Sequence, residues 1–162
     1  MIRIGNGFDV HPLVTGGPLM LGCIALPVDM HLQGHSDGDC AAHAVADALL
    51  SATISRDLGS LFPTTPENTG ISGSSILKKT AFMLDAAGYS IVNIDLSIVC
   101  DQPHLAQYLE QMRIAMADCL NIKKGDIMVK ARHVEGLAFQ GKNTGIAALA
   151  VVLVSNDRAL DK

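Results

Sequence analysis

The sequence contains no tryptophan, only 4% aromatic residues, and more Asp and Glu than Lys and Arg, which gives a formal net charge of −4. Domains that bind nucleic acids typically carry a basic surface and aromatic rings that stack on bases. The longest uninterrupted apolar run, IAALAVVLV at 146–154, has nine residues, whereas a membrane-spanning helix needs about 20. We therefore expect neither a nucleic-acid partner nor a membrane span.

Closely spaced cysteine pairs are also missing. The four cysteines stand far apart, at Cys23, Cys40, Cys100 and Cys119. Disulfide frameworks and thiolate zinc sites use an ordered series of nearby cysteines. Strand-like alternation begins at once in MIRIGNGFDVH, so we expect no signal or transit peptide. These features predict a cytoplasmic protein with reduced thiols.

What the sequence does contain is a large apolar share, 49% of residues, with a mean hydropathy of +0.31. A chain of 162 residues is long enough for a real core, and we expect a single domain over residues 1–162. Apolar residues in excess of a core usually cover a subunit interface. The composition therefore predicts an oligomer.

Hydrophobic periodicity predicts both strands and helices. Apolar residues alternate strictly over 91–100, which indicates a strand, and an Ala- and Leu-rich pattern indicates a helix over 39–54. Further strands are expected over 2–11, within 18–26, over 126–133 and over 145–155, and further helices over 74–87 and from Pro103 to about Leu120. We expect an α+β fold, a two-layer sandwich of a mixed β-sheet with about three helices on one face.

Aspartate and histidine recur in two short stretches, of which GFDVH places Asp9 and His11 on the same face of an expected strand. In HSDGDCAAHAVAD, Asp39, His43 and Asp47 recur every four residues, so they share one face of the expected helix. Asp9, His11 and His43 offer one oxygen and two nitrogen ligands and leave a fourth position open, the pattern of a catalytic zinc. Asp39 or Asp47 would then accept a hydrogen bond from the far ring nitrogen of a ligating histidine. A helix cap with a buried histidine explains the same residues equally well.

His35 and Ser36 stand directly before that helix. The N-terminus of a helix presents free N–H groups and the positive end of the helix dipole, and both suit a phosphate. A metal beside it would indicate phosphate chemistry, because both neutralise charge on phosphoryl oxygens. A plain turn is equally compatible with these two residues alone.

A second group of polar residues follows the last but one expected strand. The stretch KARHVEGLAFQGKNTG contains the basic residues Lys130, Arg132, His133 and Lys142, which suit a phosphate, and Glu135, which suits Mg²⁺. A solvated turn at the end of a strand is the alternative interpretation.

Four stretches together resemble the 2-C-methyl-D-erythritol 2,4-cyclodiphosphate synthase family: GFDVHP, GHSDGDCAAHAVADALL, DLGSLFP and GLAFQGKNTGIAALAVVLV. The similarity runs in register from about residue 3 to residue 155. It implies a homotrimer whose sheets pack around a three-fold axis, with active sites between neighbouring subunits. It also implies a lyase of non-mevalonate isoprenoid biosynthesis, which converts 4-diphosphocytidyl-2-C-methyl-D-erythritol 2-phosphate into the 2,4-cyclodiphosphate and releases CMP.

The resemblance also implies the site residues. The family's zinc ligands match Asp9, His11 and His43, and its phosphate-binding pair matches His35 and Ser36. The residues that hold methylerythritol or ribose hydroxyls match Asp57 and Gly59, and the carboxylate that takes a second metal, Mg²⁺ or Mn²⁺ on the substrate diphosphate, matches Glu135. Catalytic roles would thus fall to His35, Ser36, Asp57 and Glu135. The segment 55–75, which has no periodic pattern, would close over the substrate.

The nucleotide side departs from the family pattern. Thr64 stands where the family usually has aspartate, His104 where it has lysine, and Arg132-His133 where it favours threonines; Asn6 replaces a histidine before GFDVH. Arg132, His133 and Lys142 are expected to contact phosphate instead.

Two other functions therefore stay open at this point. One is a metal-dependent phosphohydrolase or cyclase of the same fold that acts on a related diphosphate. The other is a non-catalytic trimer that binds a phosphorylated or isoprenoid ligand, although such a protein has little use for a zinc with an open position.

Overall fold

The computed structural model describes residues 1–133, 135 and 145–156. Its strands are β1 (Ile2–Thr15), β2 (Leu19–Leu21), β3 (Ile24–Leu26), β4 (Met30–Leu32), β5 (Ser90–Val99), β6 (Ile127–Arg132) and β7 (Gly145–Ser155). Its helices are α1 (Cys40–Thr53), α2 (Leu58–Leu61), α3 (Gly73–Ala86) and α4 (Leu109–Leu120), with short 3-10 turns η1 (Pro66–Asn68) and η2 (Lys124–Asp126).

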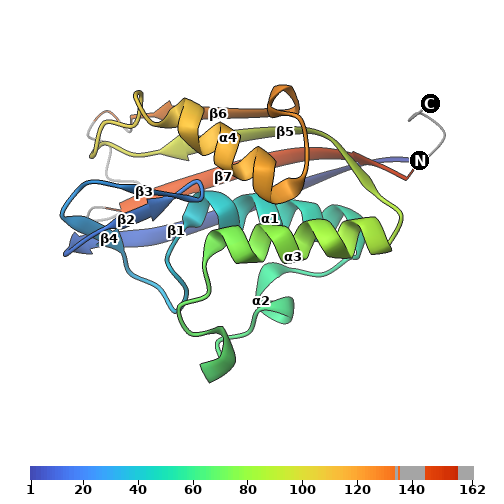
Figure 1. The fold of residues 1–162 in the computed structure, drawn as a ribbon, viewed down its shortest axis with the longest axis horizontal. Coiled ribbons are helices and arrows are strands. Elements are labelled where there is room, and N and C mark those ends of the chain that lie inside the picture. Colours follow the sequence, from blue (N-terminus) through green and yellow to red (C-terminus); the bar gives the residue numbers. More distant parts are fainter. Residues whose placement is uncertain (134, 136–144, 157–162) are drawn as a thin grey trace.

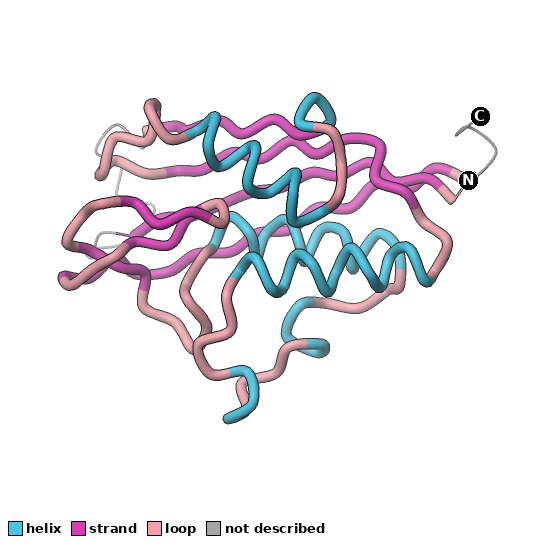
Figure 2. The backbone as a smooth tube through the Cα atoms, in the orientation of Figure 1, coloured by secondary structure: helices cyan, strands magenta, loops and turns pink. Residues whose placement is uncertain are grey.

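Five strands form one sheet in the order β4-β1-β7-β5-β6, and β2 and β3 form a separate hairpin. β5 and β6 pair in parallel, and the other neighbours are antiparallel. The sheet is thus mixed, and Figure 2 shows it as one layer of strands beside one layer of helices. The predicted α+β sandwich of a mixed sheet with three long helices on one face is confirmed (Figure 1).

The central helix α1 lies between β1 and β7 of the sheet on one side and α3 on the other. Most of its side chains are buried, which explains why the sequence there is small and apolar. Two glycines of β1 permit this close packing: a Cβ on Gly5 would lie 2.1 Å from the Ala48 carbonyl oxygen, and one on Gly7 would lie 2.1 Å from that of Ala44. Asp9 and His11 continue the same face of β1.

Two expected boundaries differ in the structure. β1 continues to Thr15 because its far end pairs with β4. The β2–β3 hairpin separates these two strands in the sequence, so the pairing is not visible in a local pattern. The third helix was expected to begin at Pro103, and this was wrong, since α4 begins at Leu109. Between β5 and α4, Leu105 is buried in the core, so this connecting segment packs against the domain before the helix begins.

The face of the sheet opposite the helices carries exposed apolar side chains. They include Ile2, Ile4, Phe8 and Val10 on β1 and Leu149 and Val151 on β7. Apolar patches of this kind usually mark an interface. None of the helices in the described residues has the length and apolar character needed to cross a bilayer.

Candidate active site

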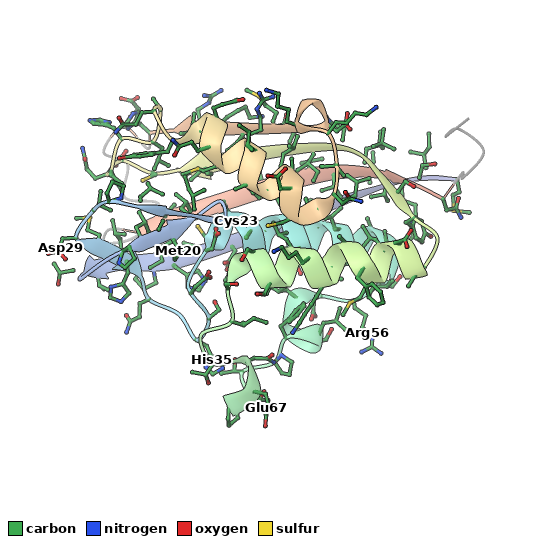
Figure 3. The ribbon with its side chains drawn as sticks, viewed as in Figure 1. Met20, Cys23, Asp29, His35, Arg56 and Glu67 are labelled. Atoms are coloured by element: carbon green, nitrogen blue, oxygen red, sulfur yellow. The ribbon has the colours of Figure 1, made fainter. Side chains whose placement is uncertain are left out.

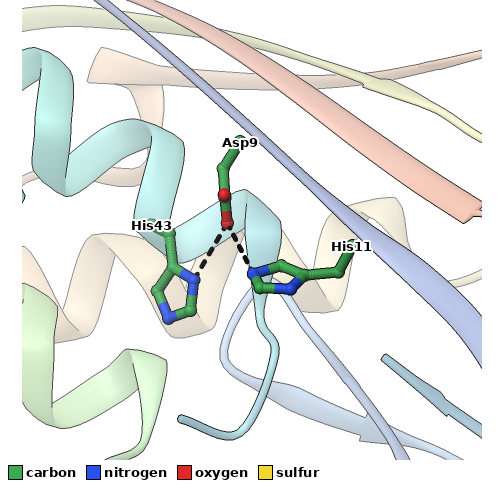
Figure 4. Close-up of side chains that lie close together, drawn as sticks. All are labelled: Asp9, His11 and His43. Carbon is green, nitrogen blue, oxygen red and sulfur yellow. Dashed lines mark hydrogen bonds and ion pairs between the residues drawn. The ribbon is translucent and has the colours of Figure 1, made fainter. Parts of the chain in front are cut away.

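Three side chains from β1 and α1 converge at one point. The Oδ2 atom of Asp9 lies 3.0 Å from His11 Nε2 and 3.0 Å from His43 Nδ1, and Figure 4 shows the carboxylate between the two rings. The three ligand atoms all lie within 4.8 Å of one another. Within the described ranges this is the one group of three or more potential metal ligands.

This cluster fits a divalent metal ion. Zinc bonds of about 2.0–2.2 Å in a tetrahedral site place ligand atoms roughly 3.3 Å apart, so the observed 3.0 Å separations need only a small outward shift. One carboxylate and two imidazoles are a suitable donor set for zinc. The ligands predicted from spacing are therefore brought together by the fold.

His11 and His43 stabilise the charged form of Asp9, and Asp9 stabilises that of His11. Burial opposes ionisation of Asp9, but the hydrogen bonds and charges of His11 and His43 outweigh it and hold the pKa of Asp9 well below its usual range. The hydrogen bond to Asp9 raises the pKa of His11, against the effect of burial. A metal ion that binds here meets an ionised carboxylate, as coordination requires.

The far ring nitrogens have partners other than those expected. His11 Nδ1 lies 2.9 Å from the Gln33 carbonyl oxygen, which leaves Nε2 for a metal, and His43 Nε2 lies 3.3 Å from Ser36 Oγ. The prediction that Asp39 or Asp47 would accept from a ligating histidine was wrong.

Those two carboxylates accept backbone N–H groups instead. Asp39, fully buried, accepts from Gly22 and Cys23 of the β2–β3 turn and from Ala42 in α1. Asp47 accepts from the N–H of Leu58 at the start of α2. Both carboxylates therefore brace the elements around the site rather than the histidine rings.

His35 and Ser36 face the same cavity as the metal cluster. This cavity has a volume of about 190 Å³ and is lined by Asp9, His11, His35, Ser36, His43, Leu58, Gly59, Phe62, Thr64, Asn68, Ile71 and Ile76. His35 Nε2 lies 2.9 Å from the Thr65 carbonyl oxygen, and Figure 3 shows His35 beside the loop that carries Glu67. The segment expected to close over the substrate thus supplies much of the cavity wall.

Sequence reasoning missed the apolar part of this wall, which consists of Leu58, Phe62, Ile71 and Ile76. The first three lie in or next to a segment without periodicity, so the usual core pattern did not identify them. A larger hollow of about 530 Å³ lies where α3 and α4 end, and it holds none of the predicted site residues.

The other predicted residues that the structure describes do not line the 190 Å³ cavity. Asp57 caps α2 and accepts from the Ser60 N–H at 2.6 Å. Lys130 pairs with Asp95 on the sheet, Arg132 ends β6, and Glu135 is exposed. Lys142 lies outside the described residues.

His133 takes part in a small cluster at the ends of β5 and β6. Its Nδ1 lies 3.7 Å from Asp101 Oδ1, and its ring meets that of His104 edge-on at 5.6 Å.

All four cysteines are free thiols, and burial raises the pKa of Cys100 to about 12, which disfavours the reactive thiolate.

Comparison with known proteins identifies the family of this chain. The YgbB family matches residues 2–155. A 2-C-methyl-D-erythritol 2,4-cyclodiphosphate synthase of Caldicellulosiruptor bescii is 41% identical over 95% of this chain and 99% of its own. A protein of the same name from Pelotomaculum thermopropionicum is 45% identical over 94% of this chain and 95% of its own.

Solved structures give the same result. A CDP-bound 2C-methyl-D-erythritol-2,4-cyclodiphosphate synthase superposes with a TM-score of 0.86 at 33% identity, over 94% of this chain and all of the other. The bifunctional IspDF of Campylobacter jejuni reaches 0.89 at 34% identity over 95% of this chain, which spans 42% of that longer protein. The chain therefore belongs to the YgbB family and is a relative of the 2-C-methyl-D-erythritol 2,4-cyclodiphosphate synthases.

Proposed function

We propose that this chain converts 4-diphosphocytidyl-2-C-methyl-D-erythritol 2-phosphate into 2-C-methyl-D-erythritol 2,4-cyclodiphosphate and CMP, as a cytoplasmic lyase of isoprenoid biosynthesis. The observation that carries the proposal is one cavity lined by three converging metal ligands and by the His35–Ser36 pair. Relatives at 41% and 45% identity bear the name of that synthase, and a solved neighbour is a CDP-bound form.

The reaction is an intramolecular phosphoryl transfer. An oxygen of the 2-phosphate attacks the β-phosphorus, the bond from that phosphorus to the oxygen shared with the α-phosphorus breaks, and CMP leaves with that oxygen. Both the nucleophile and the leaving group belong to the substrate, so no side chain has to attack. Catalysis then consists of positioning and charge neutralisation.

On the metal side, Asp9, His11 and His43 would hold Zn²⁺, which when bound neutralises charge on phosphoryl oxygens. His35 Nε2 donates to the Thr65 carbonyl oxygen, which holds the ring in the cavity wall, where it contacts the substrate phosphate. Ser36 lies on the same wall and donates its hydroxyl. These two side chains orient the phosphate that reacts.

On the nucleotide side, Glu135 would hold Mg²⁺ or Mn²⁺ together with the substrate diphosphate, since such ions favour one or two carboxylates plus phosphates. Arg132 and Lys142 supply positive charge for the phosphates, and His133 contacts them through a ring nitrogen. Asp57 and Gly59 sit at the start of α2 next to the cavity and bind sugar hydroxyls.

The active form is a homotrimer with the active sites between subunits. The apolar face of the sheet supports this, because Ile2, Ile4 and Phe8 are more than half exposed in the isolated chain. The separation of Arg132 and Glu135 from the cavity of the same chain supports a site completed by a neighbour. Light scattering should give about three times the chain mass of 17.1 kDa, and a clean monomer would contradict the shared site.

Product analysis tests the function directly. The purified chain is incubated with the cytidyl diphosphate substrate, Zn²⁺ and Mg²⁺, and the phosphorus species are followed by NMR. CMP and the cyclic diphosphate should appear in a one-to-one ratio, and the same sample treated with a zinc chelator should produce neither. Zinc-loaded protein that releases no CMP would overturn the proposal.

A second candidate, a hydrolase or cyclase that acts on a related diphosphate, is favoured by one observation. The cluster of His104, His133 and Asp101 occupies the nucleotide side with groups that the resemblance does not account for. An open-chain phosphate product in the NMR experiment, in place of the cyclic one, would select this candidate.

A further inference from the structure

The ring nitrogen of His43 that points away from Asp9, Nε2, faces two side chains that are not among the metal ligands, Ser36 and Asp37. His43 is almost fully buried, and with Nδ1 turned to Asp9 its Nε2 lies 3.3 Å from Ser36 Oγ and 3.9 Å from Asp37 Oδ1. Metal-ligating histidines usually donate this second N–H to a carboxylate or another acceptor, which fixes the ring. Here Ser36 Oγ lies within hydrogen-bond distance of Nε2, and the Asp37 carboxylate lies beside it at ion-pair distance.

The Asp37 carboxylate is held from several sides. Its Oδ2 accepts the N–H of Gly73 at the start of α3 at 2.8 Å, and its Oδ1 accepts the N–H of Asp39 at 3.1 Å. Its own N–H donates to the Ile71 carbonyl oxygen at 3.1 Å. The side chain is only 13% exposed, so these hydrogen bonds hold the carboxylate in place beside His43.

A metal on Nδ1 leaves the ring proton of His43 on Nε2. Ser36 Oγ already accepts the N–H of Gly38 at 3.2 Å. If it also accepts from His43 Nε2, both of its lone pairs are engaged, and its own hydroxyl hydrogen has to point elsewhere. Ser36 lines the cavity, so the hydroxyl is left as a donor to an anion there.

We propose that Asp37 is a positioning residue: its carboxylate, beside the Nε2 edge of His43, fixes the orientation of that ring toward the metal and toward Ser36, and so leaves the Ser36 hydroxyl as a donor to the substrate phosphate. The inference rests on the proposed function for the identity of the anion, but its metal-binding part does not need turnover. It links metal binding to phosphate binding through one buried ring.

The test compares Asp37→Asn with Asp47→Asn. Each change removes one carboxylate that accepts a backbone N–H near α1, but only Asp37 faces His43. Zinc affinity, measured by competition with a coloured chelator, should fall about 10- to 100-fold in Asp37→Asn and stay within twofold of the wild type in Asp47→Asn. If Asp37→Asn does not fold, Asp37→Ser keeps a small acceptor for the turn and should show the same loss.

A double-mutant cycle tests the path through Ser36. With zinc saturating, Asp37→Asn should weaken the binding of inorganic pyrophosphate in the wild-type background and have no further effect in the Ser36→Ala background. Zinc affinity should still fall in both backgrounds.

Several outcomes separate the inference from the proposed function. A zinc affinity within twofold of the wild type, with only a lower melting temperature, would mean that Asp37 merely braces α3, and the inference fails. A wild-type chain that binds no zinc overturns both ideas. A chain that binds zinc, shows the Asp37→Asn loss and forms no cyclic product keeps the inference and loses the function.

Discussion

The metal side of the site and its nucleotide side are built in different ways. Asp9, His11 and His43 lie on a long strand and a buried helix that pack on each other, whereas His104, His133 and Glu135 lie on exposed chain beyond the ends of β5 and β6. Packing and hydrogen bonds determine the positions of the three metal ligands almost completely. The second set is free to vary at little cost in stability, which suits a region that selects between ligands.

The largest effect is expected from breaking the metal side itself. His43→Ala leaves only two protein ligands, so the bound zinc, measured by atomic absorption, should fall from one per chain to near zero. Activity should fall by roughly 10³-fold or more, since the metal stabilises several kcal/mol of charge. His31→Ala is the control, because the His31 ring lies against the Gly16 carbonyl oxygen and does not line the metal cavity. A full zinc complement in His43→Ala would disprove the ligand assignment.

A change that touches no ligand should also disturb the metal side. In Gly7→Ala the new Cβ meets the backbone of α1 at 2.1 Å, so the helix must move away from β1 and carry His43 with it. The free energy of unfolding in urea should fall by roughly 3 kcal/mol, together with the zinc affinity.

Gly125→Ala provides the matched control for this change, because a Cβ at Gly125 meets nothing within 4 Å. Its unfolding midpoint and zinc content should match those of the wild type. Equal stability of Gly7→Ala and Gly125→Ala would mean that close packing does not determine the metal geometry.

The two sides also differ in how far the sequence alone could predict them. Alternation on β1 and four-residue spacing on α1 are local patterns, and they indicated the three ligands as one of two interpretations. A capped helix with a buried histidine fits the same patterns, so the family resemblance was needed to select the metal site. The roles of Asp39 and Asp37 depend on contacts with the β2–β3 turn and with the start of α3, and no local pattern records those. The same holds for the meeting of His133 with Asp101, which follows from the parallel pairing of β5 with β6.

On the nucleotide side, Glu135→Gln should distinguish the role of Mg²⁺ from that of zinc. The amide removes the negative charge that holds a divalent ion, so turnover at saturating zinc should fall about 30- to 100-fold, equal to about 2–2.7 kcal/mol of transition-state stabilisation. Zinc content should be unchanged, because Glu135 does not line the metal cavity. An unaltered Mg²⁺ titration would contradict the role given to Glu135.

The smallest effect is expected from His104→Ala. This ring meets His133 at 5.6 Å on the exposed side of the site, so its loss should raise KM for the cytidyl substrate by about two- to fivefold, as for a weakly held contact. kcat and zinc content should not change, because His104 does not line the cavity that holds the metal ligands. A large fall in kcat would mean that the histidine cluster takes part in the chemistry, and the two sides would then no longer be separable. A KM that does not move at all would show that backbone atoms recognise the base, and that the side chain at this position is free to vary.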